Sequence, residues 1–132
     1  MKTIGAAAKA SGISRKMIRY YEQIGLLPAP SRSESGYRYY SAAAIEQLCF
    51  IKQARELGFS LPRIQQLLSL WQNSQRHSAD VKAIAEQYIE ELEQSIEQLQ
   101  SMRQKLLNLT EQCHGDQHPE CPIINNLALK PN

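Results

Sequence analysis

The chain has 132 residues, of which 42% are hydrophobic, a composition typical of one or two small folded domains. It contains no apolar run long enough to cross a membrane and no recognisable secretory signal, so we expect a cytoplasmic protein with no membrane partner. The net charge is only +2, but seven cationic side chains and two carboxylates lie within the first 40 residues. This basic N-terminal third predicts an anionic partner.

The first 25 residues predict a helix, a tight turn and a second helix. Thr3 is suited to cap a helix that runs to about residue 10, and Gly12 is suited to the turn. Ser14 can cap the second helix, which ends at Gly25. Apolar residues recur at helical spacing on one side of this helix. The opposite side carries basic and aromatic residues, namely Arg15, Lys16, Arg19 and Tyr20.

Arg15 and Lys16 fall in the first turn of the second helix, where the helix dipole disfavours cations by a few tenths of a kcal/mol. An external phosphate group would explain this placement, because helix N-termini attract anions. A basic face in contact only with solvent is the alternative that these two residues leave open.

The segment after the second helix predicts a two-stranded hairpin, or wing. Two prolines stop the helix, SESG is typical of a turn, and YRYY has strand propensity. Arginine interleaved with tyrosine suits a phosphate backbone. The candidate residues of the wing are Arg32, Tyr37 and Arg38, accompanied by Tyr39 and Tyr40. An aromatic loop packed on the core is the alternative for at least one of the tyrosines.

Two further helices are expected, capped by Ser41 and Ser60 and separated by Gly58. Their apolar residues, Trp71 among them, would complete a core. Cys49 lies within an apolar helix face, so we expect a buried side chain and not a ligand.

Residues 79–110 contain neither proline nor glycine and predict one long helix, for which Ser78 is a suitable cap. Such a helix is about 48 Å long, whereas a compact globule of this chain length is only about 36 Å across. Its apolar residues follow a heptad spacing with Ser95 as the polar exception; they are Val81, Ala85, Tyr88, Leu92, Leu99, Met102, Leu106 and Leu109. We expect a coiled-coil homodimer, because folding back on its own domain could cover only half of the helix.

Cys113 and Cys121 bracket a short polar segment near the C-terminus. An odd number of cysteines in a reducing compartment disfavours a disulfide. Soft thiolates select Cu(I) and similar ions, whereas a structural zinc site normally has four ligands. His114 and His118 are either solvated or extra ligands for Zn(II) or Cu(II), and the residues alone leave both interpretations open. A short helix is expected to start at Pro122.

The order of these parts resembles the MerR family of metal- and stress-responsive transcription activators. The segments IRYYEQIGLL, GYRYY and RELGFSL carry the resemblance. It implies a mainly α fold with a winged helix-turn-helix DNA-binding domain over residues 1–72. A hinge and a long antiparallel coiled-coil dimerisation helix would occupy residues 73–111, and a metal-binding loop with a short helix would occupy residues 112–132.

Within the family, SQRHSADVK, QSMRQKLLNL and CHGDQHPECPII resemble the copper-efflux regulator branch. This resemblance implies a dimeric activator that senses Cu(I), and also Ag(I) or Au(I), through Cys113 and Cys121. Ser78 matches a position that is serine in the monovalent-ion branch and cysteine in branches that sense divalent ions. The positions matching the DNA contacts of the family are Arg19, Tyr20, Tyr37 and Arg38.

The resemblance also implies a mechanism. The dimer would bind double-stranded promoter DNA with and without metal, and metal would make it distort the DNA so that RNA polymerase transcribes metal-efflux genes. A zinc or thiol-redox sensor on the same fold is the main alternative. An enzyme is not expected, because the sequence offers no nucleophile–base pair and no glycine-rich phosphate loop. A structural coiled-coil adaptor would leave the basic first 40 residues unexplained.

Overall fold

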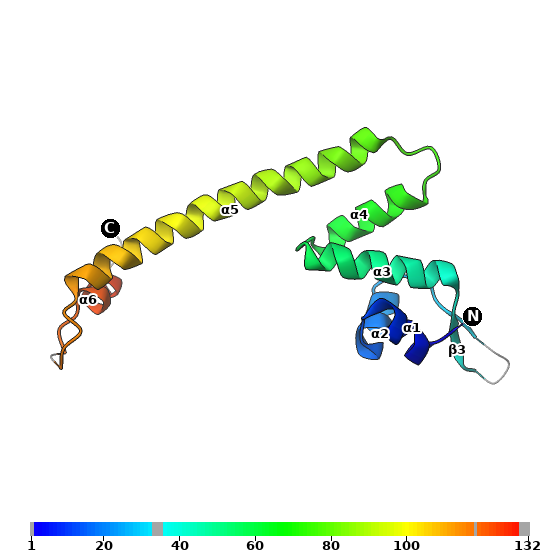
Figure 1. Ribbon diagram of the computed structural model, residues 1–132, viewed down its shortest axis with the longest axis horizontal. Coiled ribbons are helices and arrows are strands. Elements are labelled where there is room, and N and C mark those ends of the chain that lie inside the picture. Colours follow the sequence, from blue (N-terminus) through cyan, green and yellow to red (C-terminus); the bar gives the residue numbers. More distant parts are fainter. Residues whose placement is uncertain (1, 33–35, 118, 130–132) are drawn as a thin grey trace. The chain divides into compact units, whose positions relative to one another are not determined.

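A computed structural model describes residues 2–32, 36–117 and 119–129 of the chain (Figure 1). The chain divides into two units, residues 1–84 and residues 85–132, and each is described by itself. Among the described residues, no helix combines the length and the apolar character that a membrane span requires.

The first unit combines helices with a small sheet. Its elements before residue 73 are β1 (Lys2–Thr3), α1 (Ile4–Ser11), α2 (Arg15–Gln23), β2 (Ser31–Arg32), β3 (Arg38–Tyr40), α3 (Ala42–Glu56) and α4 (Leu61–Gln72). The strands lie in the order β1-β3-β2, and both pairings are antiparallel. The sequence therefore predicted the hairpin of β2 and β3 but missed β1, because a strand of two residues carries no recognisable alternation.

The four helices of this unit that precede residue 73 start at the predicted caps. The side-chain oxygens of Thr3, Ser14, Ser41 and Ser60 each accept a backbone N–H three residues further on, at 3.1–3.4 Å. Gly12 ends α1 with a φ of +75°, a left-handed conformation that favours glycine. These local signals fix the turn between α1 and α2 and hence the direction in which α2 leaves it.

The core of the first unit lies between the four helices and the sheet. Its completely buried large side chains are Ile18, Leu48, Ile51 and Ile64. They come from α2, α3 and α4, so that burial of one apolar face of each helix holds the unit together.

Several residues expected in the core are only partly covered. Met17 and Ile24 lie at the edge of the apolar side of α2 and keep 37% and 43% of their surface exposed. Trp71 is stacked on Phe50 with ring centroids 5.0 Å apart, and its outer side stays exposed. Cys49 is half-buried, whereas the sequence predicted a buried side chain. Helical spacing identifies the apolar side of a helix but not where its edge lies.

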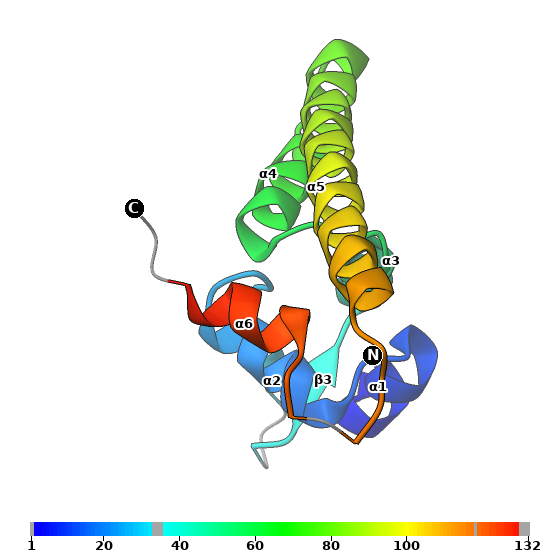
Figure 2. The same ribbon diagram turned by 90° about the vertical axis from the view of Figure 1, so that its left-hand side faces the viewer.

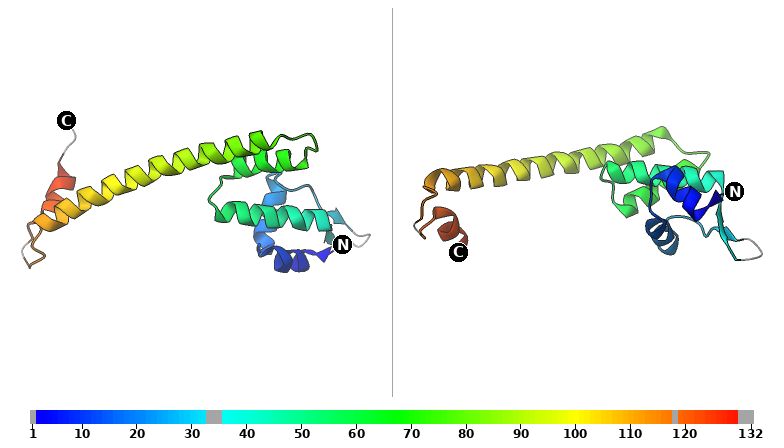
Figure 3. Two further views of the ribbon diagram at one scale, coloured as in Figure 1. Left: turned by 45° about the horizontal axis from the view of Figure 1, so that its top comes forward. Right: turned by 60° about the horizontal axis from the view of Figure 1, so that its bottom comes forward.

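A long helix, α5 (Ser78–Gln112), begins in the first unit and continues through the second, and Figure 3 shows it unbroken in both views. Ser78 was expected to precede this helix as its cap, but it is the first helical residue. None of the α5 residues is buried. The apolar stripe of α5 comprises Ile89, Leu92, Ile96, Leu99, Met102 and Leu106, all at least 40% exposed.

The second unit ends with a loop and a short helix, α6 (Pro122–Ala128), at the C-terminal end of the chain (Figure 2). Pro122 occupies the first turn, as the sequence predicted. Cys121 is the N-cap residue of α6, but its side chain makes no capping hydrogen bond.

Candidate DNA-binding surface and metal site

The outer side of α2 carries the basic residues that the sequence singled out. Arg15, Lys16, Arg19 and Tyr20 are all exposed. The guanidinium of Arg15 lies against α1, where Gly5 leaves room for it: a Cβ at residue 5 would be only 2.8 Å from Arg15 Nη2. The helix-turn-helix thus places three cations and one aromatic ring on one solvent-facing helix.

The wing lies beside α2 and adds further cations. A hollow between the C-terminal half of α2 and the wing is lined by Arg19, Arg32 and Arg38 together with the carboxylate of Glu22. Tyr37 is 68% exposed at the start of β3. The structure therefore brings together predicted DNA-binding residues from separate segments. The sequence order alone could not show that Arg19 and Arg32 line the same hollow.

A partly buried cluster of an acid, a guanidinium and a phenol joins α2 to the wing, and sequence reasoning missed it. The Glu22 carboxylate accepts a hydrogen bond from Arg38 Nη1 at 3.0 Å, and its other oxygen accepts one from the Tyr40 hydroxyl. Burial, followed by the hydrogen bond to Glu22, raises the pKa of Tyr40 to about 12. Side chains alternate along a strand, so residues 38 and 40 share one face of β3. Only this alternation, combined with the single acid of α2, could have indicated the cluster.

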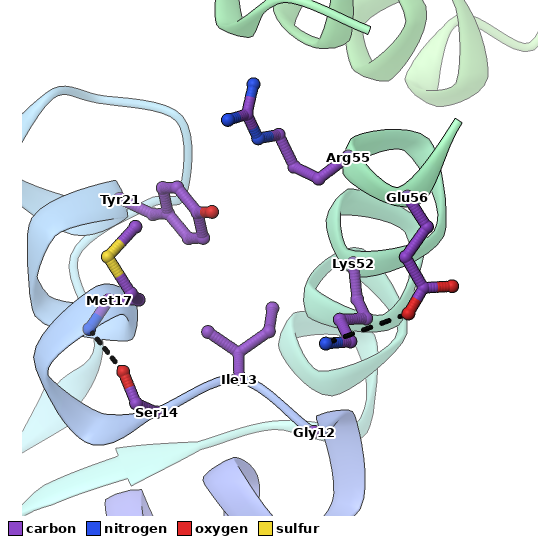
Figure 4. A pocket seen from close by; sticks show the side chains of 8 residues that line it. All are labelled: Gly12, Ile13, Ser14, Met17, Tyr21, Lys52, Arg55 and Glu56. Atoms are coloured by element: carbon purple, nitrogen blue, oxygen red, sulfur yellow. Dashed lines mark hydrogen bonds and ion pairs between the residues drawn. The ribbon is translucent and has the colours of Figure 1, made fainter. Parts of the chain in front are cut away.

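A second hollow lies between the start of α2 and the end of α3 (Figure 4). Its cations are Lys52 and Arg55 of α3. Lys52 is 3.7 Å from the Glu56 carboxylate, and Arg55 donates a hydrogen bond to the Phe59 carbonyl at 3.1 Å. Both contacts are local to the C-terminal end of α3 and the turn after it, so each cation already has a partner there.

The candidate metal site lies where α5 ends and α6 begins. The sulfur atoms of Cys113 and Cys121 are 3.1 Å apart. The Cys113 amide donates to the Thr110 carbonyl at the end of α5, and the Cys121 carbonyl accepts from the Asn125 amide in α6. Both cysteines are half-buried. Each backbone is thus fixed by a helix end, and the short loop between them brings the two thiols together.

The two thiols differ in acidity. The hydrogen bond between them raises the pKa of Cys113 and lowers the pKa of Cys121. The backbone amides of Ile124 and Ile123, at the start of α6, lower the pKa of Cys121 further. These directions make Cys121 the readier thiolate, and a Cys121 thiolate can accept a hydrogen bond from the Cys113 thiol.

The other predicted site residues are not gathered around the cysteine pair within the second unit. His114 is exposed in the loop, and His118 lies outside the described residues. Ser78 belongs to the first unit, where it lines a hollow with Arg76 and Lys82. In the parts of the chain that the structure describes, no three metal-ligating side chains of His, Cys, Asp or Glu form a cluster.

Two family models match this chain. A model described as "MerR HTH family regulatory protein" covers residues 2–71, and one described as "MerR, DNA binding" covers residues 45–109. Together they span the helix-turn-helix, the wing and most of α5. The fold and these matches define a DNA-binding helix-turn-helix transcription regulator, not an enzyme.

Individual relatives agree with the family models. The chain is 50% identical to heavy metal-dependent transcription regulator 2 of Rhizobium meliloti, over 95% of this chain and 85% of that protein. It is 47% identical to the regulator CueR of Yersinia pestis, over 95% and 90% of the two chains. The structure of PbrR691 from Ralstonia metallidurans, solved in complex with lead(II), matches with a TM-score of 0.87 and 31% identity, over 97% and 100% of the chains. The chain belongs to the MerR family, as its sequence motifs predicted.

Proposed function

We propose that this protein is a transcription activator that senses Cu(I), and also Ag(I) or Au(I), and remodels the promoter DNA of metal-efflux genes for RNA polymerase. The main observation in support of this proposal is that the two cysteine sulfurs lie 3.1 Å apart between the end of α5 and the start of α6. Relatives named for heavy-metal dependence and for the CueR regulator share about half of its residues, which supports metal sensing.

The donor set fits a soft monovalent ion. Thiolates prefer Cu(I) and similar ions over hard cations. With metal–sulfur distances of about 2.3 Å, one ion can contact two sulfurs that lie 3.1 Å apart. A linear arrangement would separate the sulfurs to about 4.6 Å, so ion binding would spread the pair by about 1.5 Å. Cys113 and Cys121 would hold the ion, and Cys121 is the sulfur that releases its proton more readily.

Ser78 is the proposed determinant of selectivity. A hydroxyl at this position supplies no thiolate, which keeps the number of soft ligands at two and disfavours divalent ions. Its neighbours in the first-unit hollow include Arg76 and Lys82.

DNA recognition is assigned to residues 1–72, with contacts from α2 and the wing. The proposed contact residues are Arg15, Lys16, Arg19, Tyr20, Arg32, Tyr37 and Arg38. Arginines that line one hollow suit the phosphate backbone, where bidentate hydrogen bonds are favoured. Residues 73–111 are assigned to the hinge and dimerisation, and residues 112–132 to metal binding.

A homodimer is proposed through the apolar stripe of α5. Leu99, at 61% exposure, is typical of this stripe. An apolar face repeated with heptad spacing is buried when two such helices pair. A two-fold dimer would also present two copies of α2 to a palindromic site, with half-sites about one helical turn apart.

The decisive experiment is an anaerobic titration of the reduced protein with Cu(I) and with Zn(II), each against a competing chelator. One tightly bound Cu(I) per subunit with weak Zn(II) is the expected result. Tight Zn(II) binding that depends on His114 or His118 would instead establish a divalent-metal sensor. The mass of the protein in solution, measured in parallel, tests the dimer.

A thiol-redox sensor is the second candidate, and the short distance between the sulfurs favours it. A disulfide bond is about 2.05 Å long, so the two sulfurs need to approach by only about 1 Å. A hydroperoxide would supply the oxidising equivalents: one thiolate attacks the peroxide, the O–O bond breaks with release of an alcohol or water, and the second thiol then displaces water from the sulfenic acid. Transcription that responds to peroxide in copper-depleted cells, and not to copper, would favour this function.

A further inference from the structure

Glu22 is the single acidic residue of α2, an element whose other charged side chains are all basic. A carboxylate next to a DNA-binding surface repels the phosphates that the cations attract. Its electrostatic effect on DNA binding is therefore unfavourable, and its contacts indicate a different role.

Those contacts are made with the wing. The Glu22 side chain is only 9% exposed, and its Oε2 accepts the hydrogen bond from Arg38 Nη1 at 3.0 Å. Its Oε1 accepts the hydrogen bond from the Tyr40 hydroxyl, and Tyr40 is almost completely buried. One carboxylate thus holds two residues on the same face of β3, 16 and 18 positions further along the chain.

Arg38 remains available to a second partner. Its side chain keeps 34% of its surface exposed and lines the same hollow as Arg19 and Arg32. A guanidinium has five N–H donors, so Arg38 can hold Glu22 and a phosphate oxygen at the same time. A long side chain fixed before binding loses less conformational entropy when the phosphate arrives.

We propose that Glu22 is a positioning residue for DNA binding, which holds the wing against α2 and orients Arg38 toward the phosphate backbone. The proposal rests on the proposed role of Arg38 as a DNA contact. It adds a requirement that the surface cations alone do not imply: affinity depends on a buried negative charge.

The substitution Glu22→Gln separates positioning from simple electrostatics, because the two predict opposite signs. Removing a negative charge near the DNA would tighten binding if Glu22 acted only through its charge. Positioning predicts a dissociation constant about tenfold higher and a salt-dependence slope smaller by about one. The probe is a duplex selected from a random-sequence pool with the wild-type protein, and the same duplex serves for every variant.

Glu46→Gln is the matched control, because it removes the same charge from an exposed carboxylate on α3. It should bind the duplex as tightly as wild type or more tightly.

Arg38→Ala tests the underlying function: if this variant binds like wild type, the proposal that Arg38 contacts DNA is wrong. If Arg38→Ala weakens binding while Glu22→Gln does not, the contact stands and the positioning role is refuted. In the Arg38→Ala background, Glu22→Gln should cause little additional loss.

Thermal unfolding of each variant distinguishes lost positioning from lost folding. If Glu22→Gln does not fold, Tyr40→Phe provides the test, because it removes only the hydroxyl that donates to Glu22 Oε1. A folded Tyr40→Phe variant should bind the duplex about threefold more weakly. Unchanged binding in that variant would overturn the proposal.

Discussion

The sulfur of Cys113 lies 3.1 Å from the sulfur of Cys121, although the two residues belong to the ends of different helices. The pair is therefore assembled by the loop and by the helix termini on both sides of it. Its function can be tested separately from the fold, since neither thiol contributes to a buried core.

Replacing either thiol should remove the metal response and leave the rest of the protein intact. Cys113→Ser and Cys121→Ser should each lower Cu(I) affinity by at least about 100-fold, because one thiolate cannot hold the ion alone. Metal-dependent transcription from a reporter should disappear while DNA binding and dimer mass are retained. Cys49→Ser is the matched control and should keep the response. Loss of DNA binding in either variant would show that the pair is structural.

Ser78→Cys should broaden the metal response. A third thiolate increases the number of soft ligands toward the set that divalent ions prefer. We expect zinc or lead to activate the reporter in this variant, with Zn(II) affinity rising about tenfold or more. Ser74→Cys adds the same thiol to the same hollow and is the control. An unchanged ion profile in Ser78→Cys would contradict the selectivity role.

Arg19→Ala should weaken DNA binding by about 1–3 kcal/mol if Arg19 contacts a base, or reduce the salt-dependence slope by about one if it contacts a phosphate. Fluorescence anisotropy at several salt concentrations distinguishes the two. Metal affinity should not change, and thermal unfolding like that of the wild type would show that the variant is folded. Arg103→Ala removes the same charge from an exposed position of α5 and should bind DNA normally.

The apolar stripe of α5 predicts the effect of a charge placed in it. Leu99→Glu should dissociate the dimer, because pairing the helices would bury an uncompensated carboxylate. The neighbouring change Gln98→Glu adds the same charge next to the heptad seam and should leave the dimer intact. Sedimentation or light scattering gives the mass of each variant. A dimer that survives Leu99→Glu would locate the interface elsewhere.

Tyr40 predicts a specific loss of stability in alkali. The pKa of this phenol is raised from its ordinary value of 10.0 to about 12 in the folded protein. A raised pKa stabilises the folded state fully below pH 10, and this contribution is lost as the pH rises toward 12. Tyr40→Phe should be less stable at neutral pH by about 1–2 kcal/mol, since Glu22 loses a hydrogen bond. The stability of wild type, measured with denaturant, should fall more steeply than that of Tyr40→Phe between these two pH values; parallel curves would contradict the assignment.

Local signals in the sequence were sufficient for the helices. Ser14, Ser41 and Ser60 each identify a helix start through chemistry that acts within three residues. The absence of proline and glycine from residues 79–110 likewise predicted α5 to within two residues at its C-terminal end. The family motifs then predicted that the wing and the loop between the two cysteines belong to one regulator.

Contacts between distant residues were not accessible in the same way. Glu22 meets Arg38 and Tyr40 only after the wing has folded against α2. Lys2 pairs with Tyr40 and so forms strand β1, which is too short to be predicted from its two residues. The distance between the two cysteine sulfurs depends on how α5 ends and α6 begins, whereas the sequence shows only that eight positions separate them. Spacing along the chain does not determine these three relationships, because each depends on the fold.

The short helix α6 has only seven residues, and isolated helices shorter than about 12 residues are marginal in water. The order of its first turn therefore depends on what holds its N-cap residue, Cys121, whose side chain makes no capping hydrogen bond. An ion bound to the Cys121 sulfur would act as the nucleus of the helix. By thermodynamic linkage, any change that stabilises α6 would then raise the affinity for the ion. Substitutions on α6 that change no ligand atom would then alter the metal concentration at which the regulator responds.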